Sequence, residues 1–124
     1  MNRSEWIKLL RFGVSGLLIT GLHASIALTL IEYAGTGPAL ANALAFVCST
    51  AGSYLLNTLW SFSSSPALAN VWRFALVSLG GLTLTALVSE ATQIAGGGPG
   101  LGIAMVICVV PPVTFIAHRC WTYR

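Results

Sequence analysis

Four apolar stretches, each about long enough to cross a bilayer, take up almost the whole of this 124-residue chain. A hydrocarbon core of about 30 Å needs roughly 20 helical residues to cross it. A lipid-exposed segment must satisfy its own backbone hydrogen bonds, so helices are the only open-ended structure that can span. The sequence therefore predicts an all-α polytopic membrane protein with four transmembrane helices in a single domain, residues 1–124. The approximate spans are residues 12–33, 39–60, 72–94 and 100–119.

The six basic residues and the four tryptophans lie where only one face of the membrane would meet them. Lys and Arg collect in the cytoplasmic loops of membrane proteins, and indole rings anchor helices at headgroup level. The pattern predicts a multi-pass protein with both termini in the cytoplasm. A segment similar to the first apolar stretch recurs mid-chain, so we expect the first stretch to be retained rather than cleaved as a signal peptide. The residues concerned are Arg3, Trp6, Lys8, Arg11, Trp60, Trp72, Arg73, Arg119, Trp121 and Arg124.

Composition excludes several classes of function. Hydrophobic residues make up 56% of the chain and charged residues 7%, against about 25% charged residues in a soluble domain. Four crossings leave no room for a soluble catalytic domain, and no acidic pair, metal-ligand spacing or nucleotide-binding glycine loop is visible. We therefore expect no enzymatic activity, no cofactor and no metal. The net charge of +3 is spread over three segments, which excludes the continuous basic patch of a nucleic-acid binder.

The two halves of the chain resemble each other. Each half would cross the membrane twice, so both halves would have the same orientation, as in a parallel duplication. This predicts two parallel-duplicated helical hairpins. The alternative is that basic and aromatic helix ends recur at any inner interface. The matching pairs are Arg11-Phe12 with Arg73-Phe74, 62 residues apart, and Asn57 with His118, Trp60 with Trp121 and Phe62 with Tyr123, each 61 apart.

Candidate binding residues lie at the cytoplasmic helix ends. Arg11, Arg73 and Arg119 are placed to meet a lipid phosphate, which a guanidinium binds in bidentate geometry. Topology alone would also put arginines at these positions. Trp60 and Trp121 would anchor their helices at the interface, or stack on the sugar of a headgroup.

Polar residues within the spans are the second group of candidates. A charge at the bilayer centre costs about 2.5–3.5 kcal/mol, so such residues suggest function. His23, Asn57, Glu90 and His118 are the candidates for a polar path through the membrane. Pro111-Pro112 removes two backbone donors from the fourth span, which predicts a helix bend or a broken turn that could form a cavity wall.

Four stretches of the chain together resemble the GtrA-like family of small bacterial membrane proteins. The resemblance implies a role in cell-surface polysaccharide synthesis in the bacterial inner membrane. Family members are thought to move a polyprenyl-phosphate-linked monosaccharide, such as undecaprenyl-phosphate glucose, from the cytoplasmic to the outer leaflet, without a cofactor. The stretches are RFGVSGLLITGLHASIALTLIE (11–32), ALANALAFVCSTAGSYLLNTLWSF (39–62), RFALVSLGGLTLT (73–85) and VVPPVTFIAHRCWTYR (109–124).

Three functions remain open at this point. The first is a flippase for the lipid-linked sugar. The second, also implied by the resemblance, is a scaffold that recruits a membrane glycosyltransferase without transporting anything. The third is a small proton-coupled exporter, which ranks last because such proteins need a membrane-embedded carboxylate in the first span, where this chain has His23 centrally and Glu32 only at the end. Four short helices enclose little volume, so we expect a homo-oligomer.

Overall fold

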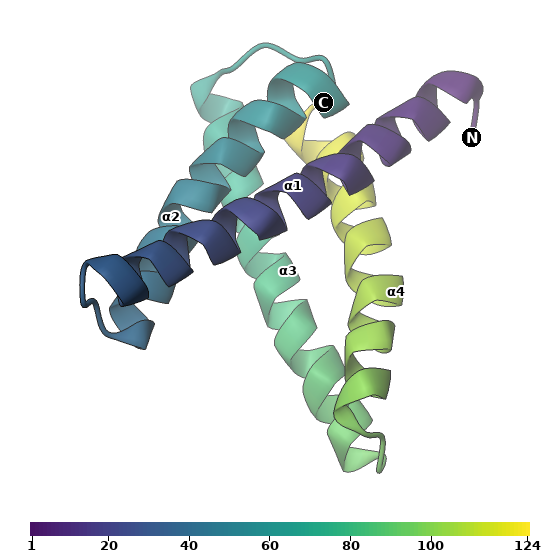
Figure 1. Ribbon diagram of the computed structural model, residues 1–124. Helices are drawn as coiled ribbons and strands as arrows, with labels where there is room; N and C mark the ends of the chain where they lie inside the picture. Colours follow the sequence, from purple (N-terminus) through teal and green to yellow (C-terminus); the bar gives the residue numbers. More distant parts are fainter. The chain divides into compact units, whose positions relative to one another are not determined.

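The computed structural model of the chain contains helices and, among the described residues, no strand (Figure 1). The structure describes residues 1–37, 40–98 and 100–124. The all-α prediction is therefore confirmed. Two of the six elements, η1 and η2, are single π-helical turns that continue the helix before them. In chain order the elements are α1 (Arg3–Tyr33), α2 (Pro38–Leu56), η1 (Asn57–Ser61), α3 (Leu68–Ile94), α4 (Pro99–Ala117) and η2 (His118–Thr122).

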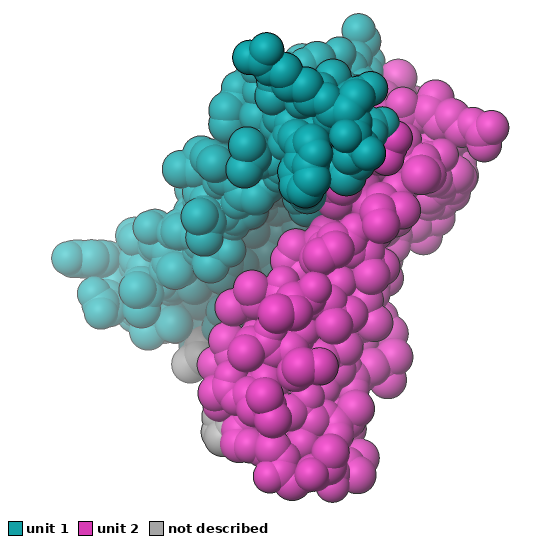
Figure 2. All heavy atoms as spheres, turned by 90° about the vertical axis from the view of Figure 1, so that its right-hand side faces the viewer, with its two compact units in different colours: residues 1–66 teal, residues 67–124 magenta. Residues whose placement is uncertain are grey.

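The chain divides into two compact units, residues 1–66 and residues 67–124 (Figure 2). In the first unit α1 packs against α2 and η1, and in the second unit α3 packs against α4 and η2. Each unit is therefore a helical hairpin. Gly35 and Gly96, in the turns of the two hairpins, have φ angles of +65° and +86°. These left-handed conformations carry no steric penalty in glycine.

A capping box fixes the start of α1. The backbone N–H of Glu5 donates to the Asn2 side chain at 3.0 Å, and the N–H of Asn2 donates to the Glu5 carboxylate at 3.3 Å. Both groups would otherwise lack a partner at a helix N-terminus. The helix consequently begins at Arg3, nine residues before the predicted span.

Three helical segments of the described part of the chain are long and apolar enough to cross a membrane: Arg3–Tyr33, Leu68–Ile94 and Gly100–Thr122. Their large apolar side chains point outward; Leu17 and Ile94, for example, are 77% and 80% exposed. Apolar side chains on the outside of a helical hairpin are typical of contact with lipid. This confirms a multi-pass membrane protein. The second helix carries polar residues along its length, and its crossing of the bilayer stays a prediction.

Small residues lie where the helices of the first unit meet. Ala41 and Ala45 are fully buried on α2, and Ser15 is fully buried on α1. Small side chains let two backbones approach closely in a membrane, where helices gain little from burying apolar surface. Close approach brings the polar groups described below within hydrogen-bonding distance.

The fourth helix continues through its two prolines. Pro111 and Pro112 lie inside α4, which runs as one helix to Ala117. The chain therefore does not break there, although the prolines remove two backbone donors. The helix widens only after Ala117, at η2.

Candidate functional site

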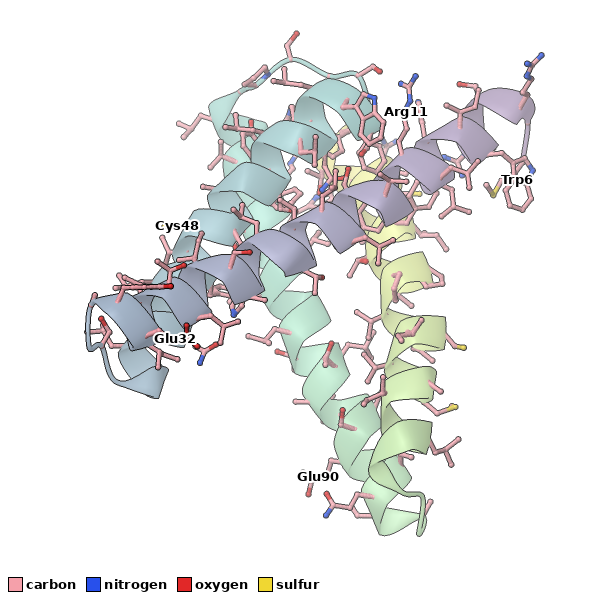
Figure 3. The ribbon with its side chains drawn as sticks, viewed as in Figure 1. Trp6, Arg11, Glu32, Cys48 and Glu90 are labelled. Carbon is pink, nitrogen blue, oxygen red and sulfur yellow. The ribbon has the colours of Figure 1, made fainter. Side chains whose placement is uncertain are left out.

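The first arginine–tryptophan cluster consists of Arg11 on α1 and Trp60 in η1. Arg11 Nη1 donates to the Trp60 carbonyl oxygen at 3.2 Å, and the guanidinium carbon lies 5.7 Å from the centre of the Trp60 ring. Figure 3 shows Arg11 directed toward the end of the second helix, with Glu32 toward the opposite end of α1. A cation over an indole face within about 6 Å is attracted by the ring quadrupole.

The second arginine–tryptophan cluster consists of Arg73 and Trp72 on α3 with Trp121 in η2. Arg73 Nη1 donates to the Trp121 carbonyl oxygen at 3.1 Å. The guanidinium carbon lies 5.7 Å from the Trp121 ring centre and 5.5 Å from that of Trp72. The two indoles meet edge to face at 5.3 Å. Each unit thus has the same arginine–carbonyl bond and the same arginine–indole contact.

The position of Trp60 and Trp121 in a last, π-helical turn explains why their carbonyls accept an arginine. The N–H of Phe62 bonds to the Asn57 carbonyl at 2.9 Å, and that of Tyr123 bonds to the His118 carbonyl at 3.0 Å. Both are i to i−5 bonds, which widen the last turn. The final carbonyls of a helix have no intrahelical donor. An arginine from the neighbouring helix supplies one, and its positive charge also suits the helix C-terminus.

The two clusters retain the capacity to bind an anion. A guanidinium has five N–H donors, and one nitrogen of each arginine contacts a carbonyl. Arg73 Nε is buried without a hydrogen-bond partner. Arg73 as a whole is partly exposed, and a phosphate oxygen is a suitable acceptor for the remaining guanidinium donors. Trp60 and Trp121 are 38% and 39% exposed, so a sugar can approach them.

Arg119 and Glu90 lie outside the pattern that the two clusters share. Arg119 is in η2 and its side chain is exposed. Glu90 is exposed near the end of α3 (Figure 3). It is 17 residues beyond Arg73, or about 26 Å at 1.5 Å per residue, so the structure does not bring these two together.

Asn57 and His118 occupy the first position of η1 and η2, and both are buried. Asn57 Nδ2 donates to the Ser53 carbonyl at 3.0 Å and to its hydroxyl at 3.1 Å, while Asn57 Oδ1 is buried without a partner. The His118 ring stacks on Phe74 at 4.5 Å, and its Nδ1 lies 3.0 Å from the Thr122 hydroxyl. Since the two residues are 2% and 3% exposed, a sugar could reach them only if the helix ends opened.

His23 links the two helices of the first unit. Its Nε2 lies 3.2 Å from Asn42 Oδ1, and its Nδ1 lies 3.4 Å from the Ser49 hydroxyl, both on α2. The tautomer with hydrogen on Nε2 satisfies both contacts, because Nδ1 then accepts from the hydroxyl. Sequence reasoning placed His23 on a polar path; the structure gives it an interhelical bond that such a path would have to break.

Sequence reasoning missed a buried serine pair. The hydroxyls of Ser15 on α1 and Ser61 in η1 lie 2.9 Å apart, and neither residue is exposed to solvent. The signal that could have found Ser61 is its spacing from Thr122, because these residues are also 61 apart. The matching position to Ser15 is Val77, so no polar pattern marked Ser15.

Among the described residues of the second unit, cavities lie between the two helices at two levels. One, of about 460 Å³, begins one helical turn after Arg73 and is lined mainly by apolar atoms of α3 and α4. The other, of about 430 Å³, lies at the turn of the hairpin and includes Ser89, Thr92 and Gln93 in its lining. Both volumes fall in the range of about 300–1,000 Å³ that is common for small-molecule sites.

Apolar helical hairpins, each with an arginine and an indole in contact at its end, define an integral membrane protein. A family model described as "GtrA/DPMS, transmembrane domain" matches residues 11–123. The chain belongs to this family, which confirms the resemblance found in the sequence and indicates a membrane protein of glycoconjugate synthesis. No curated protein and no solved structure matches the chain.

Proposed function

We propose that this protein moves a polyprenyl-phosphate-linked monosaccharide from the cytoplasmic to the outer leaflet of the bacterial inner membrane. The observation that carries the proposal is the recurrence of the arginine–tryptophan cluster in both units. An arginine held at a helix end offers charge and directional donors for the phosphate, and the adjacent indole offers a flat face for the sugar. No covalent chemistry and no cofactor are needed, because the lipid-linked sugar is the same compound before and after crossing.

The proposal includes an arrangement of four crossings. The shared contacts of Arg11 with Trp60 and of Arg73 with Trp121 support a tandem duplication of one hairpin. Two hairpins in the same orientation would put both clusters, and both termini, at the cytoplasmic face. This arrangement requires α2 to cross the bilayer. Cysteine labelling from either side of intact cells tests it, and periplasmic labelling of either terminus would contradict it.

Purified protein in liposomes tests the transport step. Radiolabelled polyprenyl-phosphate glucose would be placed in one leaflet, and its arrival in the other measured with a membrane-impermeant reagent. A hydrogen bond to a charged group contributes about 1.5–3 kcal/mol, so Arg73→Gln should slow movement about 10- to 100-fold. Arg11→Gln should act in the same direction.

Arg3→Gln is the matched control, because Arg3 is exposed and lies outside both clusters. It should leave the rate unchanged. Helix content and unfolding of each variant would be compared, because the arginines also hold helix ends. Wild-type movement in the two cluster variants would refute the phosphate role.

A scaffold that recruits a membrane glycosyltransferase is the second candidate. It is favoured by the exposure of Trp6 and Trp72, which are 55% and 46% exposed and lie near the start of their helices. Exposed tryptophans suit a protein interface as well as a headgroup region. The same liposomes distinguish the candidates. Movement with the purified protein alone supports the flippase, and movement that requires the enzyme supports the scaffold.

A further inference from the structure

We infer that the groove between α3 and α4 holds the isoprenoid chain of a polyprenyl phosphate whose phosphate is bound by Arg73. This inference rests on the proposed function and names the part of the molecule that would bind the lipid. The cavity measures about 460 Å³. It is lined mainly by apolar atoms, and Val77, Gly80, Gly81, Leu84, Leu87 and Ala117 are among its residues.

The position of the groove relative to the arginine supports this occupant. Residues 77, 80, 81, 84 and 87 follow residue 73 at intervals that keep them on one face of a helix. Ala117 lies one turn before Trp121 on the facing helix. The groove therefore leads away from the second arginine–tryptophan cluster, with an apolar lining next to a cationic mouth. A lipid with one phosphate and a long hydrocarbon chain has the complementary chemistry.

The length of the groove also fits. From Arg73 to Leu87 is 14 residues, or about 21 Å along α3. The hydrocarbon core is about 30 Å thick. A chain anchored at the inner end would thus be sheltered through the inner leaflet and beyond the midplane. At the mouth, Arg73 is partly exposed, so a phosphate can approach its guanidinium.

The described residues of the first unit are bulkier at the matched level. Where α3 has Gly80 and Gly81, α1 has the bulky Leu18 and Ile19, 62 residues earlier. An added Cβ on Gly52 of α2 would meet Leu22 at 3.5 Å and Ile19 at 3.6 Å, so side chains fill that space. An added Cβ on Gly80 would meet nothing within 4 Å. The two glycines therefore leave more space beside α3 at this level than Leu18 and Ile19 leave beside α1.

The test is photo-crosslinking in lipid nanodiscs. A polyprenyl phosphate with a diazirine in its chain and no sugar is the probe, and unlabelled polyprenyl phosphate is the competitor. We expect saturable labelling of the peptide that contains residues 77–87 or of residues 113–117. Gly80→Leu, which introduces the side chain found at Leu18, should lower labelling about tenfold, equivalent to ~1.4 kcal/mol of binding.

Gly16→Leu is the matched control, because an added Cβ there also meets nothing within 4 Å. It should label like the wild type. Circular dichroism of both variants would show whether each has folded; if Gly80→Leu does not fold, Gly80→Cys with a small apolar thiol adduct replaces it. Labelling confined to α1 and α2, or unchanged by the groove variants, would overturn the inference. A disulfide between two molecules of the Gly80→Cys variant, formed without lipid labelling, would also overturn the inference. It would show that a second copy of the protein fills the groove.

The inference and the proposed function can fail separately. Groove labelling without transport of the glucose-linked lipid would refute the flippase and leave the chain site intact. Transport that proceeds normally in Gly80→Leu, with labelling elsewhere, would refute the groove and leave the flippase intact.

Discussion

The hydrogen bond between Ser15 and Ser61 gives the sharpest test of how the first unit holds together. The hydroxyls are 2.9 Å apart and both residues are fully buried. Removing one hydroxyl leaves the other without its partner, whereas removing both leaves none unpaired. Ser15→Ala and Ser61→Ala should therefore each destabilise the protein, and the double variant should be less destabilised than their sum.

The expected size of this coupling follows from membrane proteins in general. Interhelical hydrogen bonds in a bilayer contribute about 0.6 kcal/mol on average and at most about 1.7. That corresponds to about a 3- to 16-fold change in the unfolding equilibrium. The pair should lie in the upper part of this range, because neither hydroxyl can turn to water.

Reversible unfolding in mixed micelles with increasing dodecyl sulfate measures the four free energies of the cycle, with helix content as the signal. A cycle of Ser25→Ala with Ser61→Ala is the control. Ser25 bonds within its own helix, to the Gly21 carbonyl at 2.8 Å, and lies about 15 Å along α1 from Ser15. Distant sites should be additive. A coupling no larger than the control's would refute the assignment of the serine bond as a link between helices.

Two further variants test the packing of the units in the same unfolding assay. Gly81→Ala should lower the free energy of unfolding by about 1–3 kcal/mol, because the added Cβ would lie 2.9 Å from Thr114 Cγ2. Gly13→Ala is the control, because a Cβ there meets nothing within 4 Å. It should leave the free energy of unfolding unchanged or raise it by up to about 1 kcal/mol. Equal effects of the two would show that the helices are not in close contact at Gly81. His23→Phe should cost about 1.2 kcal/mol, from two interhelical contacts at about 0.6 each, and an unchanged free energy of unfolding would contradict the bonds assigned to His23.

The sequence was sufficient for the class of the fold and for part of the site. Apolar length predicts helices in lipid because the bilayer permits almost nothing else. The offsets of 62 and 61 residues marked Arg11, Trp60, Arg73 and Trp121, and the structure pairs each arginine with the tryptophan of its own unit. The repeated spacing predicts that the same residue types recur at the ends of both hairpins. The pattern does not predict which atoms make contact. These contacts depend on how each helix is rotated about its axis, and a wide apolar stripe is compatible with several rotations.

The π-helical turns could not be predicted in this way. An i to i−5 bond competes with an i to i−4 bond that the same residues could form, and residue type alone does not decide between them. His118 illustrates the consequence. A histidine near a membrane-spanning helix end suggests a polar path, yet its ring also has apolar faces, and the structure stacks one on Phe74. Burial of this kind depends on a neighbour that is 44 residues away in sequence.

The two units satisfy the hydroxyl at the end of the π-helical turn in different ways, and the difference bears on function. In the first unit Ser61 bonds across to Ser15 and ties η1 to α1. In the second unit Thr122 bonds to His118 within its own turn, and the position that matches Ser15 is Val77, which lines the groove. A hydroxyl at residue 77 would put a polar group into the apolar lining just beyond Arg73. Keeping the bond inside η2 leaves the lining next to Arg73 apolar, which would suit the isoprenoid chain that we infer there.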